Sequence, residues 1–124
     1  MFKNVLLTAV LALAASAGAA ASDKAMIITQ VAKPAECIAS VHIRKIDGEE
    51  KIVPAQGFEI EPGVHSMTGT ARLDLRNCQV ARGNVHTEIP PLESDFEAGR
   101  KYWVGLDYRS PDRNEWALVI WKVE

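Results

Sequence analysis

Hydrophobic and polar residues alternate along most of the chain beyond residue 21. The segment Cys37–Ile46 shows this clearly, because its apolar and polar positions fall on opposite parities: Ala39, Val41 and Ile43 against Ser40, His42 and Arg44. A period of two places every second side chain on the same face, so the segment predicts a half-buried strand. It ends at Asp47-Gly48, a dipeptide typical of tight hairpins, and Ile52-Val53 is expected to start the returning strand.

A second tight reversal is predicted in the middle of the chain. Phe58–Ile60 leads into Pro62-Gly63, where proline fixes φ and glycine supplies the positive φ that a type II turn requires. The alternation then continues from His65 to Leu75, with Met67 and Ala71 on the apolar parity. This run is long for one strand, so Gly69 is expected to mark a bulge or bend.

Two further segments complete the first two thirds of the chain. Met26–Val31 is rich in β-branched residues and is followed by Lys33-Pro34, which predicts a first strand at a sheet edge. Gln79–Ile89 predicts another strand, and Pro90–Asp95 is expected to be a loop.

The last third of the chain predicts a hairpin. Its strands are Arg100–Arg109 and Glu115–Val123, joined by the loop Ser110–Asn114. A five-residue loop places three favourable pairs opposite one another: Arg109 and Glu115, Tyr108 and Trp116, Trp103 and Trp121. The final strand is apolar on both faces and is expected to be central. Together the segments predict an all-β fold, a single antiparallel β-sandwich of about seven strands over residues 22–124.

Residues 1–21 have the order of a secretory signal peptide. Lys3 precedes an apolar run that is too short to span a bilayer, and small residues ending in Ala19-Ala20-Ala21 follow. An N-terminal membrane anchor is the alternative. We expect cleavage after Ala21 and a periplasmic or secreted protein, and no lipid anchor, because no cysteine stands at the cleavage point.

The charge of the chain limits the class of partner, and its two cysteines bear on the chemistry of an exported protein. Without residues 1–21 the chain keeps 13 of its 14 Lys and Arg against 16 Asp and Glu, a formal charge of −3, which argues against nucleic acid or an anionic membrane as main partner. Cys37 and Cys78 are the two cysteines, and in an exported protein they predict one disulfide. A reactive thiol or a metal thiolate is the alternative.

Candidate catalytic and metal-binding residues form no recognisable motif. His42, His65 and His86 have metal-binding side chains, but their spacing matches no compact ligand set. The carboxylate pairs Glu49-Glu50 and Glu59/Glu61 are expected to be solvated, the first at a hairpin tip and the second on a polar strand face. We therefore predict no catalytic residue, no cofactor and no metal.

Trp103 and Trp121 are the candidate binding residues. If Tyr102, Val104 and Leu106 face the core, the two tryptophans lie together on the opposite face of the last hairpin. Paired exposed aromatics are typical of surfaces that bind a protein or a glycan. The alternative is that both faces of the sheet are covered and the tryptophans belong to the core.

Three short motifs resemble PEGA-type domains of bacterial envelope proteins. They are Ile46-Asp47-Gly48, Ile60-Glu61-Pro62-Gly63-Val64-His65 and Phe96-Glu97-Ala98-Gly99-Arg100-Lys101-Tyr102, which match a hairpin, a corner and a strand start of that family. The resemblance implies a small transthyretin-like β-sandwich that acts as a non-enzymatic accessory or interaction module. The Cys37/Cys78 pair is not part of the family pattern.

A second functional hypothesis is a small exported inhibitor or immunity-type protein that blocks an enzyme with a surface loop. The candidate loops are Ser110–Asn114 and Ile89–Leu92.

Overall fold

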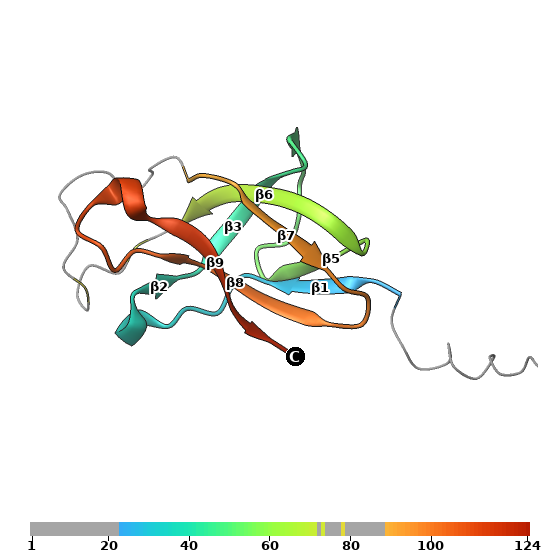
Figure 1. The fold of residues 1–124 in the computed structure, drawn as a ribbon, viewed down its shortest axis with the longest axis horizontal. Coiled ribbons are helices and arrows are strands. Elements are labelled where there is room, and N and C mark those ends of the chain that lie inside the picture. Colours follow the sequence, from blue (N-terminus) through green and yellow to red (C-terminus); the bar gives the residue numbers. More distant parts are fainter. Residues whose placement is uncertain (1–22, 72, 74–77, 79–88) are drawn as a thin grey trace, which may run out of the picture.

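The computed structural model describes residues 23–71, 73, 78 and 89–124. Within these residues the chain forms nine strands and two short 3₁₀ turns, and the strands make two sheets stacked as in a sandwich (Figure 1). The elements in order are β1 (Ala25–Ile28), η2 (Pro34–Glu36), β2 (Ile38–Ala39), β3 (Val41–Ile46), β4 (Glu49–Glu50), β5 (Gly57–Ile60), β6 (Gly63–Ala71), β7 (Leu92–Phe96), β8 (Lys101–Asp107), η3 (Arg113–Glu115) and β9 (Ala117–Val123). The predicted all-β class is confirmed, with two more strands than expected.

The first sheet has the order β2-β8-β1-β5, and β9 also pairs with β8. β1 lies between β5 and β8, so the prediction of an edge strand is wrong: Lys33-Pro34 follows the strand at a distance and shapes η2 instead. β1 pairs in parallel with β8, so the sheet is mixed, not purely antiparallel. Among the described strands β9 pairs with β8 alone, and the central position expected for it is not found there.

The second sheet has the order β4-β3-β6-β7 and is antiparallel throughout. Asp47 and Gly48 have φ of 55° and 83°, the double positive φ of the predicted two-residue hairpin turn. The returning strand is β4, not Ile52-Val53, and Ile52 is fully exposed. β7 occupies a segment expected to be a loop. Its five residues begin directly after Pro90-Pro91, and a strand this short shows little alternation in the sequence.

The Pro62-Gly63 reversal carries the chain from one sheet to the other. It joins β5 in the first sheet to β6 in the second, and Gly63 has a φ of 124°. Met67 and Ala71 are buried, as the alternation predicts. The predicted irregularity near Gly69 is present, but the extra residue belongs to the partner strand: the β3–β6 register shifts between Ile43 and Lys45.

The core lies between the two sheets and is formed by the inward parity of their strands. Its largest fully buried apolar side chains are Tyr108, Phe96, Ile27, Ile43, Met67, Leu106 and Val104. Phe96 from the second sheet meets Tyr102 from the first edge to face, with ring centroids 4.9 Å apart. The Tyr102 hydroxyl also accepts a hydrogen bond from the Glu97 backbone N–H at 2.7 Å. Contacts of this kind hold the two sheets together.

The C-terminal hairpin follows the predicted register only in its half next to the loop. Leu106 pairs with Leu118, and the Tyr108 and Trp116 rings are in contact at 6.1 Å. A bulge between Trp103 and Val104 then shifts the ladder, so Trp103 lies opposite Lys122 rather than Trp121. The expected pairing of Arg109 with Glu115 is also wrong, because the Arg109 guanidinium pairs with Asp107 at 2.6 Å.

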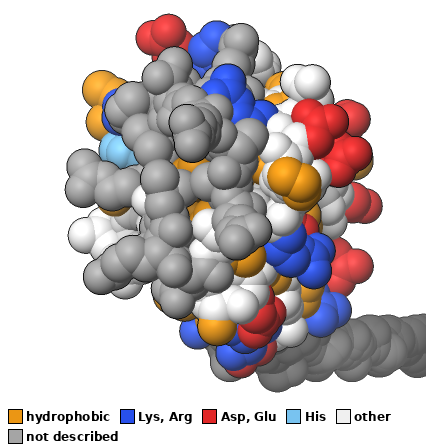
Figure 2. Space-filling model, turned by 90° about the vertical axis from the view of Figure 1, so that its left-hand side faces the viewer, with side chains coloured by type: hydrophobic (Ala, Val, Ile, Leu, Met, Phe, Trp, Pro, Cys, Tyr) orange, Lys and Arg blue, Asp and Glu red, His pale blue; other side chains and the backbone are white. Residues whose placement is uncertain are grey.

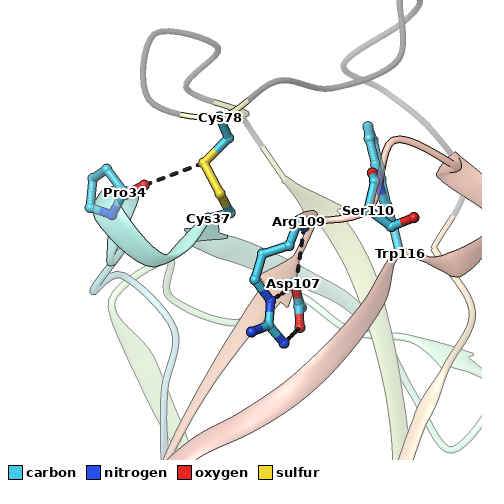
Figure 3. The surroundings of a disulfide bond; sticks show 7 residues. All are labelled: Pro34, Cys37, Cys78, Asp107, Arg109, Ser110 and Trp116. Atoms are coloured by element: carbon cyan, nitrogen blue, oxygen red, sulfur yellow. Dashed lines mark hydrogen bonds and ion pairs between the residues drawn. A yellow bond between two sulfur atoms is a disulfide. The ribbon is translucent and has the colours of Figure 1, made fainter.

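The predicted disulfide between Cys37 and Cys78 is present (Figure 3). It joins residues 41 positions apart, with Cα atoms 5.9 Å apart. Cys37 is fixed by two backbone hydrogen bonds, from its N–H to Pro34 and from the Tyr108 N–H to its carbonyl. The bond therefore ties the chain beyond β6 to the first sheet.

Two predictions concern residues that the structure does not describe. The signal peptide at 1–21 and most of the strand predicted at 79–89 lie outside the described residues. Within the described residues, no helix is long and apolar enough to cross a membrane.

Candidate functional site

Trp103 and Trp121 lie on the outer face of the first sheet. Tyr102 and Val104, the neighbours of Trp103 in β8, are buried in the core, so the side chain between them points away from it. Both tryptophans are half-buried, and neither joins the hydrophobic core cluster. This is the placement that the sequence predicts for a binding face.

The two indoles contact each other, and each is accompanied by a lysine. Their ring centroids are 6.4 Å apart and their planes are inclined by 55°. Lys122 Nζ lies 4.6 Å from the Trp103 centroid, and Lys33 Nζ lies 5.3 Å from the Trp121 centroid. Both distances suit a cation–π interaction.

The two lysines also have acidic partners. Lys122 pairs with Glu124 at 3.0 Å, and Lys33 pairs with Glu36 at 3.1 Å. The charges at the rim of the tryptophan pair are therefore balanced, and the surface presents aromatic rings rather than net charge.

The indole of Trp121 packs closely against the sheet at Gly105, because glycine has no side chain there. A Cβ at Gly105 would lie 2.6 Å from Cγ2 of Ile38 and 3.3 Å from Nε1 of Trp121. That Nε1 is buried and has no hydrogen-bond partner among the described residues. One edge of the indole is thus held against the strand while the rest of the side chain stays partly exposed.

Apolar neighbours extend the surface on both sides. Ile28 of β1 pairs with Trp103, and Val119 of β9 pairs with Gly105. Both are partly buried and alternate with core residues. We call the set Ile28, Trp103, Val119 and Trp121 the aromatic face.

Both ring nitrogens of His65 make hydrogen bonds within the protein. Its Nδ1 lies 2.7 Å from Oδ2 of Asp47, and its Nε2 lies 2.7 Å from the carbonyl oxygen of Glu61. Both partners are acceptors, so the ring must donate from both nitrogens. The hydrogen bond to Asp47 raises the pKa of His65, and the same bond lowers the pKa of Asp47. Neither ring nitrogen is free to bind a metal.

The other metal and acid–base candidates do not converge. His42 Nε2 lies 3.2 Å from the carbonyl oxygen of Val53, and His86 is outside the described residues. The part of the chain that the structure describes holds no group of three or more metal-binding side chains. Glu61 pairs with Lys24, and that hydrogen bond lowers the pKa of Glu61. Glu49 lies 3.8 Å from Lys51, and Glu59 is exposed.

The loop Ser110–Asn114 is internally hydrogen-bonded. The Ser110 hydroxyl donates to Glu115 at 2.7 Å and accepts from the Asp112 N–H, while Asp112 accepts from the Asn114 N–H at 2.9 Å. The indole N–H of Trp116 donates to the Ser110 carbonyl at 2.8 Å (Figure 3 labels both residues). In the second candidate loop, Leu92 already belongs to β7.

Charged side chains are mixed on the face drawn in Figure 2. Basic groups lie next to acidic ones where side chains of described residues are drawn.

Sequence reasoning identified the tryptophan pair but missed the lysines beside it and the contact of His65 with Asp47. Lys122 lies opposite Trp103 because of the bulge in the hairpin, which the alternation of apolar and polar residues does not predict. Comparisons with protein-family models, curated proteins and solved structures found no match.

Proposed function

We propose that this protein is an exported, non-enzymatic β-sandwich that serves as an interaction module of the cell envelope or its surroundings. Its aromatic face would bind a protein or a glycan. The observation that carries the proposal is the contact of two half-buried indoles, Trp103 and Trp121, on the side of the sheet that faces away from the core. Tryptophans in such positions are typical of binding hot spots.

The chemistry of the aromatic face favours an uncharged contact surface on the partner. Lys33 and Lys122 are neutralised by Glu36 and Glu124, so electrostatic attraction contributes little. The indoles offer flat apolar area that is already held in place, which lowers the entropic cost of binding. The apolar face of a sugar ring or an apolar patch of a protein meets these conditions.

Three observations support export and a non-catalytic role. The Cys37–Cys78 disulfide suits an oxidising compartment, and residues 1–21 have the pattern of a signal peptide. His65 and Glu61, which acid–base chemistry could have used, are engaged in structural contacts. The resemblance to PEGA-type domains leads to the same proposal.

Affinity capture with tryptophan variants tests the proposed face. Immobilised protein is exposed to envelope extract and to a panel of glycans. We expect Trp103→Ala and Trp121→Ala each to weaken capture by roughly tenfold or more, as for a hot-spot residue. Val64→Ala is the matched control, because Val64 is an exposed apolar residue on the other sheet. Capture that survives both tryptophan substitutions would contradict the proposal.

A second function, inhibition of an enzyme by a surface loop, is favoured by one observation. The loop Ser110–Asn114 is pre-organised by its own hydrogen bonds, as an inhibitory loop should be. Pro111 and Asn114 are exposed. If the protein acts in this way, Pro111→Ala or Asn114→Ala abolishes inhibition of the captured enzyme, while Trp103→Ala leaves inhibition unchanged.

A further inference from the structure

A hollow of about 470 Å³ lies on the second sheet, on the other side of the molecule from the aromatic face. Its lining comes from β3, from β6 and from the segment that enters β7. The volume falls within the range of small-molecule sites, which is about 300–1,000 Å³. Arg44 lines this hollow and two neighbouring ones.

A β-bulge gives the hollow two adjacent cations. In a regular strand Arg44 and Lys45 would point to opposite faces, but the register of β3 shifts between Ile43 and Lys45. Both cations are exposed, whereas Ile43 before them and Ile46 after them are buried. The bulge therefore directs two positive side chains to the solvent side of the sheet.

These two cations have no acidic partner among the described residues. Glu50 lies opposite Lys45 in the β3–β4 ladder, yet no ion pair joins them. Most other described cations do have an acidic partner: Lys24, Lys33, Lys51, Arg100, Arg109 and Lys122. Arg44 and Lys45 thus concentrate unbalanced positive charge at one hollow of an acidic protein.

The rest of the lining is polar on one side and apolar on the other. Ser66 and Thr68 of β6 contribute hydroxyl groups. The Thr68 hydroxyl donates to the carbonyl oxygen of Ile89 at 2.5 Å and so fixes the Ile89–Pro91 wall against the sheet. A ligand here would meet two cations, a hydroxyl from Ser66 and an apolar wall.

We propose that this hollow binds a small organic anion. Its carboxylate or phosphate group would be held by Arg44, whose planar guanidinium can donate two parallel hydrogen bonds, and by Lys45. Its body would lie against Ile89 and Pro91. The site is independent of the aromatic face, since it is built on the other sheet.

Titration with matched sugars tests the proposal and identifies the anionic group. The protein, expressed from the full-length sequence and purified with its disulfide formed, is titrated with glucuronate, glucose 6-phosphate and glucose, and binding is followed by calorimetry and by amide chemical shifts. We expect at least one anionic sugar to bind and to shift the amides of Ser66 and Thr68, and neutral glucose to bind at least tenfold more weakly. The anion that binds more tightly shows whether carboxylate or phosphate is preferred.

Variants separate a specific site from general electrostatic attraction. Arg44→Ala should weaken binding by roughly tenfold or more, and Arg44→Lys should have a smaller effect because the charge remains but the paired hydrogen bonds are lost. Arg100→Ala removes the same charge from an exposed position away from the hollow and should leave binding unchanged. Near-ultraviolet circular dichroism confirms that each variant is folded.

Three results would overturn the proposal. These are no binding of either anion at about 10 mM, equal binding of glucose, or unchanged affinity in a folded Arg44→Ala variant. None of them bears on capture by the aromatic face, so the two proposals fail separately.

Discussion

Nδ1 of His65 lies 2.7 Å from Oδ2 of Asp47, and this contact connects the β3–β4 turn to the strand that follows the corner between the sheets. Asp47 is the first residue of the β3–β4 turn, in the left-handed conformation. Its other oxygen accepts the Ser66 N–H at 3.0 Å. Nε2 of His65 reaches the carbonyl oxygen of Glu61 at the corner between the sheets. One imidazolium thus links a hairpin to an inter-sheet corner.

This link predicts that stability depends on pH. The hydrogen bond to Asp47 raises the pKa of His65 above its ordinary value of about 6.5. The contribution of protonated His65 to the free energy of unfolding is therefore fully present below pH 6.5, and it is lost as the pH rises through the higher pKa of the folded state. The pKa of Asp47 is lowered, so its contribution is present above the ordinary aspartate value and is lost as pH falls through the lower folded-state pKa.

Urea unfolding at pH 6 and at pH 8 measures the effect of His65. We expect a lower free energy of unfolding at pH 8, and a smaller difference between the two pH values in His65→Gln. Val64→Ala, which changes an exposed apolar residue of the same strand, serves as the control and should keep the pH difference of the parent protein. An identical pH difference in His65→Gln would show that the link does not titrate as proposed.

Removal of the disulfide should destabilise the protein strongly. The bond closes a segment of 41 residues, and the chain-entropy model gives a stabilisation of about 4 kcal/mol for a loop of this size. We expect the double variant Cys37→Ser and Cys78→Ser, which leaves no free thiol, to lose stability of that order in urea unfolding. A loss below about 1 kcal/mol would mean that the unfolded chain is already compact there.

Gly69→Ala should be costly, although alanine is the smallest possible addition. A Cβ at this position would overlap the backbone carbonyl of His42, which a change of rotamer cannot relieve. The ladder must then shift beside the bulge, and we expect a loss of about 1–3 kcal/mol in the free energy of unfolding. Thr70 on the same strand is exposed, so the free energy of unfolding of Thr70→Ala should lie within about 0.5 kcal/mol of that of the parent protein.

Gly105→Ala tests the aromatic face without changing its outward chemistry. The added Cβ would lie 2.6 Å from Cγ2 of Ile38, 2.9 Å from the backbone oxygen of Ala39 and 3.3 Å from Nε1 of Trp121, so β2 must shift and the indole must adjust by a few tenths of an ångström. We expect a changed tryptophan emission spectrum and capture of the partner weakened by several-fold, with the disulfide intact. Unchanged emission together with unchanged capture would show that the position of Trp121 is not set by Gly105.

Much of the local structure was determined by the sequence alone. The alternation around Val41 and Met67 predicts which side chains enter the core, and Asp47-Gly48 and Pro62-Gly63 predict both reversals. The two cysteines predict the disulfide. The position of Trp103 opposite the core face of its strand also follows from a period of two. Each of these features depends on residues that are close together in the chain or, for the disulfide, on the presence of two cysteines.

The tertiary structure alone decided the rest. It places β1 inside a sheet through parallel pairing with β8, a strand more than 70 residues away, and it adds β7 at the edge of the other sheet. It also places the bulges that direct Arg44 toward the hollow and Lys122 toward Trp103. Strand order and register depend on the free energy of contacts between distant segments, and a pattern of neighbouring residues carries no information about which distant segment will supply the partner.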